Sequence, residues 1–296
     1  NVNWDTTAHD FNQIQIANVD NVSLGDQNNL DIGPGGIDAT ASIDIDIDGS
    51  LTDQGSITTP TLTLDVNNNG AADNIDLDDP ATDVDTLIVN AARNINSFVD
   101  ADELNLGNVT VDRNIDITTG GEITSTGTVT GVGAFTQRFE AGAANDITLD
   151  DANNVFGTFQ VVSGDNVNVR DKNTLDLGAS TISGTLQATS DGNLTDSGAV
   201  TVVGATTLDA TADDDIILDS AGNDFNTMLI TAGYNVTLAD TDDIEFGTST
   251  ISGNWSVTAG GLISDSGPIT VGGKVILNTT GFGNAGNVVL QTDSGF

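Results

Sequence analysis

The chain has 296 residues and is strongly acidic: 44 Asp and Glu residues face 6 Lys and Arg residues, which gives a formal net charge of −38. A surface with that charge repels nucleic acid phosphates and anionic lipid headgroups, so we expect neither a nucleic acid partner nor membrane insertion. Cysteine is absent, which excludes disulfides and thiolate metal sites. The chain contains no run of about 18 apolar residues, so the sequence does not predict a membrane-spanning helix.

A glycine that closes a short apolar, polar, apolar segment recurs along the chain. It ends segments 30–33, 104–107, 175–178 and 244–247, so successive copies are roughly 70 residues apart. A second glycine ends segments 51–55, 123–127, 194–198 and 263–267, with nearly the same spacing. The two markers agree, and they define four copies of a unit of about 70 residues, numbered below as repeats 1 to 4.

Within each repeat, apolar residues alternate with polar ones over short runs, such as 236–238 and 255–257. A period of two is typical of β-strands, and the Gly, Asn, Asp and Ser residues that bound the runs are typical of turns. No segment has a helical period over about ten residues. Trp255 lies at an apolar position of its run, so we expect it in the core.

Short strands at a fixed period predict a solenoid. Each repeat divides into three loops of about 23 residues, the length of a β-helix coil, whereas a propeller blade needs about 40 to 50 residues. We therefore predict an all-β fold, a right-handed parallel β-helix (β-solenoid) with about three coils per repeat, and a single elongated domain over residues 1–296. Both ends fall at one phase of the repeat without a recognisable cap, so we expect an internal segment of a longer chain or a subunit that stacks end to end.

Several repeated phrases carry a family resemblance. NDFN, NVTLAD, STISGNWSVTAGG and ISDSGPITV, with their partners NNVF, NVNVRD, STISGTLQATSDG and LTDSGAVTV, resemble the repeat regions of bacterial filamentous haemagglutinin-type exoproteins. The likeness spans nearly the whole chain. It implies a right-handed β-helical shaft in a large surface or secreted adhesin that is exported through an outer-membrane partner. The amino-terminal export domain that defines the family is not seen in these residues.

The best local motif for a ligand is DVNNNGAADNID, residues 65–76. It is close to a calcium loop, in which a glycine makes the sharp turn and positions one, three, five, nine and twelve supply oxygen atoms. Those positions are Asp65, Asn67, Asn69, Asp73 and Asp76. The alternative is a polar Asn/Gly turn that binds no metal, because such residues commonly crowd the turns of solenoids.

The sequence gives little support for catalysis. Its only histidine is His9, and it contains neither a G-x-S-x-G nucleophile motif nor a phosphate-cradling glycine motif. Carboxylate pairs such as those of glycoside hydrolases arise by chance in a chain with 44 acidic residues. We therefore expect a protein that is not an enzyme.

These observations predict a structural or adhesive extracellular rod, a shaft segment of a large bacterial surface or secreted adhesin. Two alternatives stay open: a self-assembling extracellular fibre or surface-layer subunit that stacks end to end, and a calcium-dependent or glycan-active binding module. The expected partners are neighbouring repeats, copies of the chain itself, and a host or cell-surface glycan or protein. The expected location is outside the cell or at its surface.

Overall fold

The computed structural model describes residues 1–6, 8–66, 73–280 and 286–291. The regular elements in these residues are all β-strands, and no helix among them is long and apolar enough to cross a membrane. The strands pair in parallel and stack as a β-solenoid of about 14 turns, which confirms the predicted fold class. The chain divides into two compact units, Asn1–Gly157 and Thr158–Phe296, and each is described by itself.

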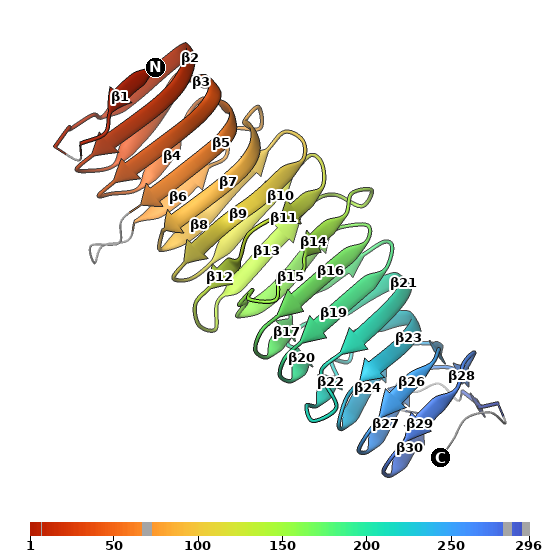
Figure 1. Cartoon of the computed structure of the whole chain (residues 1–296). Coiled ribbons are helices and arrows are strands. Elements are labelled where there is room, and N and C mark those ends of the chain that lie inside the picture. The colour runs from red at the N-terminus through yellow and green to blue at the C-terminus, as the bar shows by residue number, and fades with distance from the viewer. Residues whose placement is uncertain (7, 67–72, 281–285, 292–296) are drawn as a thin grey trace. The chain divides into compact units, whose positions relative to one another are not determined.

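The first unit contains β1 to β14 (Figure 1). The bounds of its strands are β1 (Val2–Trp4), β2 (Gln13–Asp26), β3 (Leu30–Ile47), β4 (Leu51–Asp53), β5 (Ile57–Val66), β6 (Asn74–Leu77), β7 (Asp83–Ala91), β8 (Asn94–Asp100), β9 (Leu104–Val111), β10 (Ile115–Thr119), β11 (Ile123–Ser125), β12 (Val129–Gly131), β13 (Thr136–Glu140) and β14 (Ile147–Leu149).

The second unit contains β15 to β31. The bounds of its strands are β15 (Thr158–Ser163), β16 (Val167–Asp171), β17 (Leu175–Leu177), β18 (Ser180–Ile182), β19 (Leu186–Ser190), β20 (Leu194–Asp196), β21 (Val200–Asp209), β22 (Ile216–Leu218), β23 (Asp224–Ala232), β24 (Val236–Asp240), β25 (Ile244–Phe246), β26 (Ser249–Ile251), β27 (Trp255–Ala259), β28 (Ile263–Asp265), β29 (Ile269–Val271), β30 (Val275–Asn278) and β31 (Val288–Val289).

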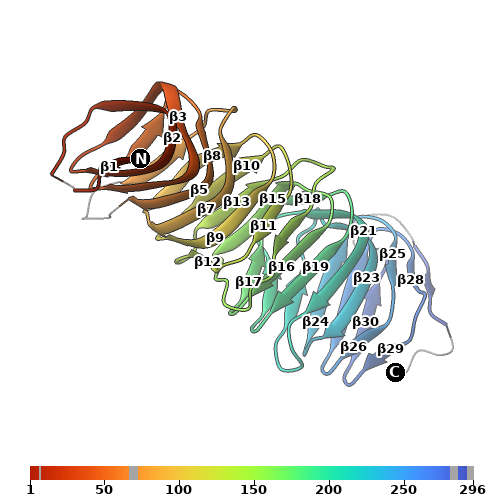
Figure 2. The same ribbon diagram turned by 45° about the horizontal axis from the view of Figure 1, so that its top comes forward.

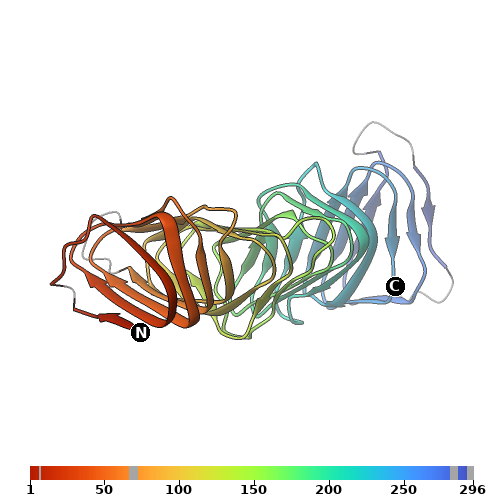
Figure 3. The same cartoon turned by 90° about the horizontal axis from the view of Figure 1, so that it is seen from above.

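Strands one turn apart stack in columns within the first unit. One column starts in β3 and continues through β4, β6 and β8, with Leu30, Leu51, Ile75 and Ile95 as successive Cα partners. The sequence distance from one partner to the next is the length of one turn. Another column contains β5, β7 and β9, which lie next to one another in Figure 2. The winding of successive turns in this unit, coloured red to yellow, can be followed in Figure 3.

The second unit has the same construction. One of its columns runs through β17, β20, β22, β24, β27 and β30. Its successive Cα partners are Leu175, Leu194, Ile216, Val236, Trp255 and Val275. Each partner lies roughly 20 residues after the previous one, so a turn has the length typical of a β-helix coil.

One sequence repeat spans three and a half turns in the first unit. Three turns lead from Leu30 to Ile95, and Leu104, the counterpart of Leu30 in repeat 2, lies nine residues further along the chain. Leu104 belongs to a different column, because β9 pairs with β7 and with β11, where its partner is Ile123. The first marker therefore moves half a turn around the coil between repeats 1 and 2.

The second unit repeats this half-turn offset. Three turns lead from Leu175 to Val236, and Ile244, the counterpart of Leu175 in repeat 4, lies eight residues further on. Ile244 is in β25, which pairs with β23 and β28 and not with the column of Leu175. The expected value of about three turns per repeat is therefore refined to three and a half. As a result, successive repeats within a unit present equivalent side chains on opposite sides of the coil.

The core of each unit consists of the side chains that point into the coil. Along β3, for example, Ile43, Ile45 and Ile47 are fully buried, while Asp44 and Asp46 between them are exposed. Each aliphatic side chain buried in this way contributes about 1.5–3 kcal/mol. Carboxylates at the outward positions stay hydrated, so the acidic composition does not disturb the core.

Trp255 also lies in the core, as the sequence predicts. It is fully buried and meets the ring of Phe246 edge to face, with the ring centroids 4.8 Å apart. Pairs of aromatic rings favour this geometry, because the positive edge of one ring lies against the negative face of the other.

A ladder of Asn and Asp side chains joins the turns at one corner of the second unit. The Oδ1 atom of Asn193 accepts a hydrogen bond from the backbone N–H of Asp215, at 2.9 Å. In the same way Asp215 accepts from Asn235, Asn235 from Asn254, and Asn254 from Lys274, at 2.9 to 3.0 Å. Each side chain thereby satisfies a backbone donor of the next turn and fixes the register between the two turns.

The second glycine marker lies against the backbone at or beside the first marker, one turn earlier. A Cβ atom on Gly127 would lie 2.5 Å from the carbonyl carbon of Gly107, and one on Gly198 would lie 2.3 Å from the nitrogen of Ala179. Non-bonded carbon contacts are ordinarily about 3.5–4.0 Å, so a side chain at either position would force the turns apart. This close approach explains why the second marker ends in glycine.

Candidate functional sites

The predicted calcium loop lies between β5 and β6. Asp65 is in β5, where its Cα partner one turn earlier is Asp46, and Asp76 is in β6. Asn67 and Asn69 lie outside the described residues. Within the described ranges, no group of three or more His, Cys, Asp or Glu side chains is arranged to hold a metal ion. Calcium binding by this loop therefore stays a prediction.

Asp73, the ninth position of the predicted loop, has an unusual environment. Its side chain is 4% exposed, and its Oδ2 atom has no hydrogen-bond partner among the described residues. A buried carboxylate oxygen without a donor or a cation is energetically unfavourable.

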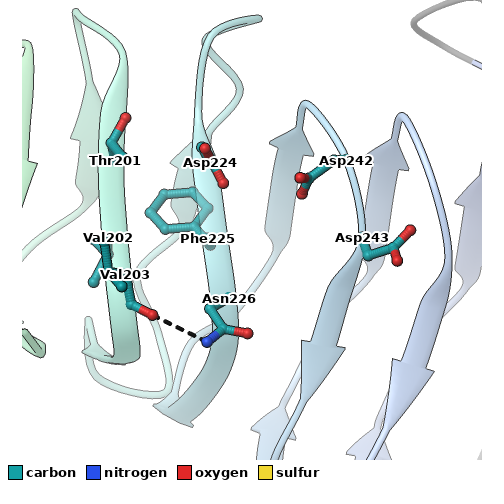
Figure 4. Close-up of a pocket in the computed structure, with 8 residues that line it drawn as sticks. All are labelled: Thr201, Val202, Val203, Asp224, Phe225, Asn226, Asp242 and Asp243. Carbon is teal, nitrogen blue, oxygen red and sulfur yellow. Dashed lines mark hydrogen bonds between the residues drawn. The ribbon is translucent and has the colours of Figure 1, made fainter. Parts of the chain in front are cut away.

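The second unit contains an open acidic pocket with a volume of about 360 Å³ (Figure 4). Its lining residues come from β21, β23 and the loop before β25, and they are Thr201, Val202, Val203, Asp224, Phe225, Asn226, Asp242 and Asp243. In Figure 4 the carboxylate of Asp242 points toward the neighbouring turn, which carries Asp224. The Nδ2 atom of Asn226 donates to the carbonyl of Val203 at 3.0 Å, which fixes one wall of the pocket.

A second acidic pocket occurs in the first unit, with a volume of about 340 Å³. Its lining includes Thr58, Asp83 and Asp85, at positions equivalent to Thr201, Asp224 and Asn226 of the second unit. The remaining lining residues are Asp38, Ala39, Thr40, Thr59 and Pro60. Both pockets offer hydroxyl and carboxylate oxygens, and neither is lined by a cationic side chain. Such a lining favours cationic or hydroxyl-rich ligands over anionic ones.

Each pocket lies beside a buried aspartate that joins two turns. In the second unit, Asp240 is fully buried; its Oδ2 atom accepts from the backbone N–H of Phe225 at 2.7 Å, and its Oδ1 atom accepts from that of Asp242 at 3.0 Å. In the first unit, Asp100 is 2% exposed and accepts from the N–H groups of Val84 and Asp102, at 2.9 and 3.2 Å. Because one donor belongs to the preceding turn, each carboxyl group acts as a staple between turns.

A buried aspartate recurs at this position in all four repeats. The buried residues are Asp26, Asp100, Asp171 and Asp240, which follow one another with the spacing of the first glycine marker. In repeats 1 and 3 the residue two positions further on is Asn28 or Asn173, and its N–H donates to the buried carboxyl at 2.8 or 2.6 Å. Repeats 2 and 4 have a second aspartate at that position.

Sequence reasoning missed these staples, although a signal was present. A single aspartate stands four residues before each copy of the first marker, as in Asp100 before Leu104. Aspartate is usually solvated, so an acidic residue by itself does not predict burial. The fixed position relative to the marker distinguishes these four residues from the other acidic residues.

Burial changes the acidity of two staples. The pKa values of Asp100 and Asp240 are raised to about 7, chiefly because burial disfavours the charged carboxylate. The backbone N–H donors oppose this effect, and the nearby carboxylates Asp102 and Asp83, or Asp242 and Asp224, add to it. Both groups consequently titrate close to neutral pH.

Comparison with known proteins gives one match. Residues 92–163, 164–232 and 233–294 each match a family model described as repeats of unknown function (DUF5649). No curated protein and no solved structure matches the chain. The three matches follow one another with the period of the glycine markers, and together they cover more than half of the 296 residues. The chain therefore belongs to the family of repeats of unknown function, DUF5649.

Proposed function

We propose that this chain is a structural or adhesive extracellular rod, a shaft segment of a large bacterial surface or secreted adhesin. The observation that carries the proposal is the parallel stacking of turns within each unit, where one strand follows another at steps of roughly 20 residues. A stack of this kind grows by adding repeats, because each turn contacts only its neighbours.

The composition of the two sides of each strand supports a load-bearing role. Inward positions are filled by Ile, Leu and Val, and outward positions by Asp, Asn and Thr, so each turn has a dry interior and a hydrated surface. The Asn and Asp ladder and the buried staples add side-chain hydrogen bonds between turns to those of the backbone. These contacts resist sliding of one turn over the next.

The proposed location outside the cell rests on the surface charge and on the family resemblance of the repeated phrases. A net charge of −38 keeps a repetitive β protein soluble and discourages edge-to-edge association. The partners proposed for such a shaft are copies of itself end to end and a host or cell-surface glycan or protein. The two acidic pockets favour a ligand rich in hydroxyl groups or positive charge.

Electron microscopy of the purified chain tests the shaft role. A variant with a second copy of residues 164–232 inserted after residue 232 should give particles roughly 17 Å longer than the wild type, since three and a half turns at about 4.8 Å per turn are added. Particles of unchanged length would contradict the proposal, and long filaments from the wild-type chain would favour the self-assembling fibre instead.

Antibody labelling of intact source cells tests the proposed location. Labelling of intact cells at the level seen after permeabilisation is the expected result. Labelling that appears only after permeabilisation would overturn the proposed extracellular location. It would not contradict the structural role, which the electron microscopy tests separately.

A further inference from the structure

Two of the four buried aspartates that precede the first glycine marker have a setting that the proposed structural role does not require. Asp100 and Asp240 are 2% and 0% exposed, yet each is followed two positions later by a second aspartate. Repeats 1 and 3 avoid this arrangement, because Asn28 and Asn173 occupy the equivalent position. The chain therefore contains two kinds of staple that share a backbone geometry and differ by one negative charge.

Asp100 is surrounded by like charge. Asp102 belongs to its own loop, and Asp83 begins β7 in the preceding turn. The following turn contributes only uncharged residues at this point, the end of β10 and the two glycines after it, 119–121. The other nearby acidic side chains, Glu103 and Asp85, act on Asp102.

Asp240 has the same surroundings in the second unit. Asp242 lies in its own loop and Asp224 begins β23 in the preceding turn. The residues that face it from the following turn are again uncharged, Ala259 and the two glycines 260–261. The same arrangement, a buried aspartate with one carboxylate in its own loop and one in the preceding turn, therefore occurs once in each unit.

No basic side chain forms an ion pair with either staple in the described part of the chain. Arg138 pairs with Asp116 and Glu140, and Arg170 pairs with Asp191, all of them partly exposed residues on the outer surface. The charge on the buried carboxyl groups is therefore opposed by hydrogen-bond donors and not by a cation. Such donors lower the pKa of a carboxyl group, but here burial and the neighbouring carboxylates outweigh them, so the protonated form is favoured.

We propose that repeats 2 and 4 contain a proton-sensitive staple: the buried carboxyl groups of Asp100 and Asp240 take up protons when the chain folds, so that the stack is most stable in mild acid and loosens as the pH rises through neutrality. In repeats 1 and 3 the neighbouring residue is an asparagine, so this additional charge is absent.

The direction of the pH effect follows from the pKa values. In the folded chain both pKa values are raised to about 7, whereas an unfolded aspartate has a pKa of about 3.9. The folded state therefore binds each proton about a thousandfold more tightly than the unfolded state does. The stability that this binding contributes is complete below about pH 4 and is lost as the pH rises through 7.

Carbon-13 NMR of the aspartate carboxyl carbons in the full chain measures the staples directly. The carboxyl carbons of Asp100 and Asp240 should titrate with midpoints near pH 7. Asp102→Asn should lower the titration midpoint of Asp100, so that its proton binds several-fold more weakly, and should leave the midpoint of Asp240 unchanged. Asp242→Asn should lower the midpoint of Asp240 and leave that of Asp100 unchanged. Both substituted residues are exposed, so these variants are expected to fold.

Asp213→Asn is the matched control, because it removes the same charge from an exposed loop and should move neither midpoint. Urea unfolding between pH 5 and pH 8 provides a second readout: the wild type should lose stability over this range, and Asp102→Asn and Asp242→Asn should lose less than the control does. Midpoints below about pH 5 for both carboxyl groups, or an Asp100 midpoint that Asp102→Asn does not lower, would overturn the proposal.

Discussion

The close approach of the second glycine marker to the preceding turn leads to a prediction for Gly198. In Gly198→Ala, the new Cβ atom would lie 2.3 Å from the nitrogen and 2.8 Å from the Cα atom of Ala179, in the turn before. Both atoms belong to the backbone, so no side-chain rotation can relieve the overlap. Because Gly198 does not have a positive φ angle, the backbone conformation itself accepts alanine, and the clash is the only expected source of strain.

The expected loss of stability follows from two opposing effects. Relieving the overlap requires the two turns to separate by about 1 Å, and overpacking of this kind costs about 1–3 kcal/mol. Replacing glycine by alanine also restricts the unfolded chain, which stabilises the folded state by about 0.4–1 kcal/mol. The net effect of Gly198→Ala should therefore be a loss of about 1–2 kcal/mol.

Gly192→Ala is the matched control. Gly192 lies six residues earlier, has no positive φ angle, and its added Cβ atom would approach the backbone of Asn173 no closer than 3.1 Å. A displacement of a few tenths of an ångström removes that contact, so the change in stability should stay within about 0.5 kcal/mol of zero.

Urea unfolding followed by circular dichroism measures both variants, with the unfolding free energy extrapolated to water and the slope used to check that the folded surface is unchanged. The reasoning is refuted if Gly198→Ala is as stable as Gly192→Ala. Such a result would mean that the turns can separate locally at little cost, and that the second marker is glycine for another reason.

Three further predictions address the core, the ladder and the calcium loop. Leu64→Ala removes a fully buried side chain between Ile45 and Val89 and should lower the unfolding free energy by about 2–5 kcal/mol in urea titrations, whereas an effect below about 1 kcal/mol would contradict the assigned core. Asn235→Ala removes the acceptor for the backbone and side-chain N–H groups of Asn254 and should cost about 1 kcal/mol in the same assay; no loss would show that water replaces the ladder. Calorimetric titration with calcium should give binding that Asp65→Ala abolishes, and an absence of heat in the wild type would leave residues 65–76 as a polar turn.

Much of the fold could be predicted from the sequence. The alternation of apolar and polar residues in runs 236–238 and 255–257 predicted strands, and the apolar position of Trp255 predicted its burial; both are confirmed. These features are local, because a strand has a period of two wherever it pairs.

The predicted number of turns per repeat was less accurate, although the spacing between the two glycine markers gives the length of one turn. Leu30 and Leu51, or Leu175 and Leu194, are Cα partners in adjacent turns, so the step from the first marker to the second is one turn. The prediction of three coils per repeat assumed that each repeat contains a whole number of turns. Nothing in the chemistry of a solenoid requires this, since stacking depends on the turn and not on the repeat.

The sequence by itself determined that this chain forms short parallel strands with aliphatic interiors and polar corners, because alternation and turn residues act over a few neighbouring positions. Only the tertiary structure decided that equivalent side chains alternate between opposite sides of the coil, and that Asp100 and Asp240 are buried with pKa values near 7. The physical reason is that burial and charge depend on the adjacent turns: the donors Val84 and Phe225 belong to the turn before each carboxyl group and meet it only when the turns stack.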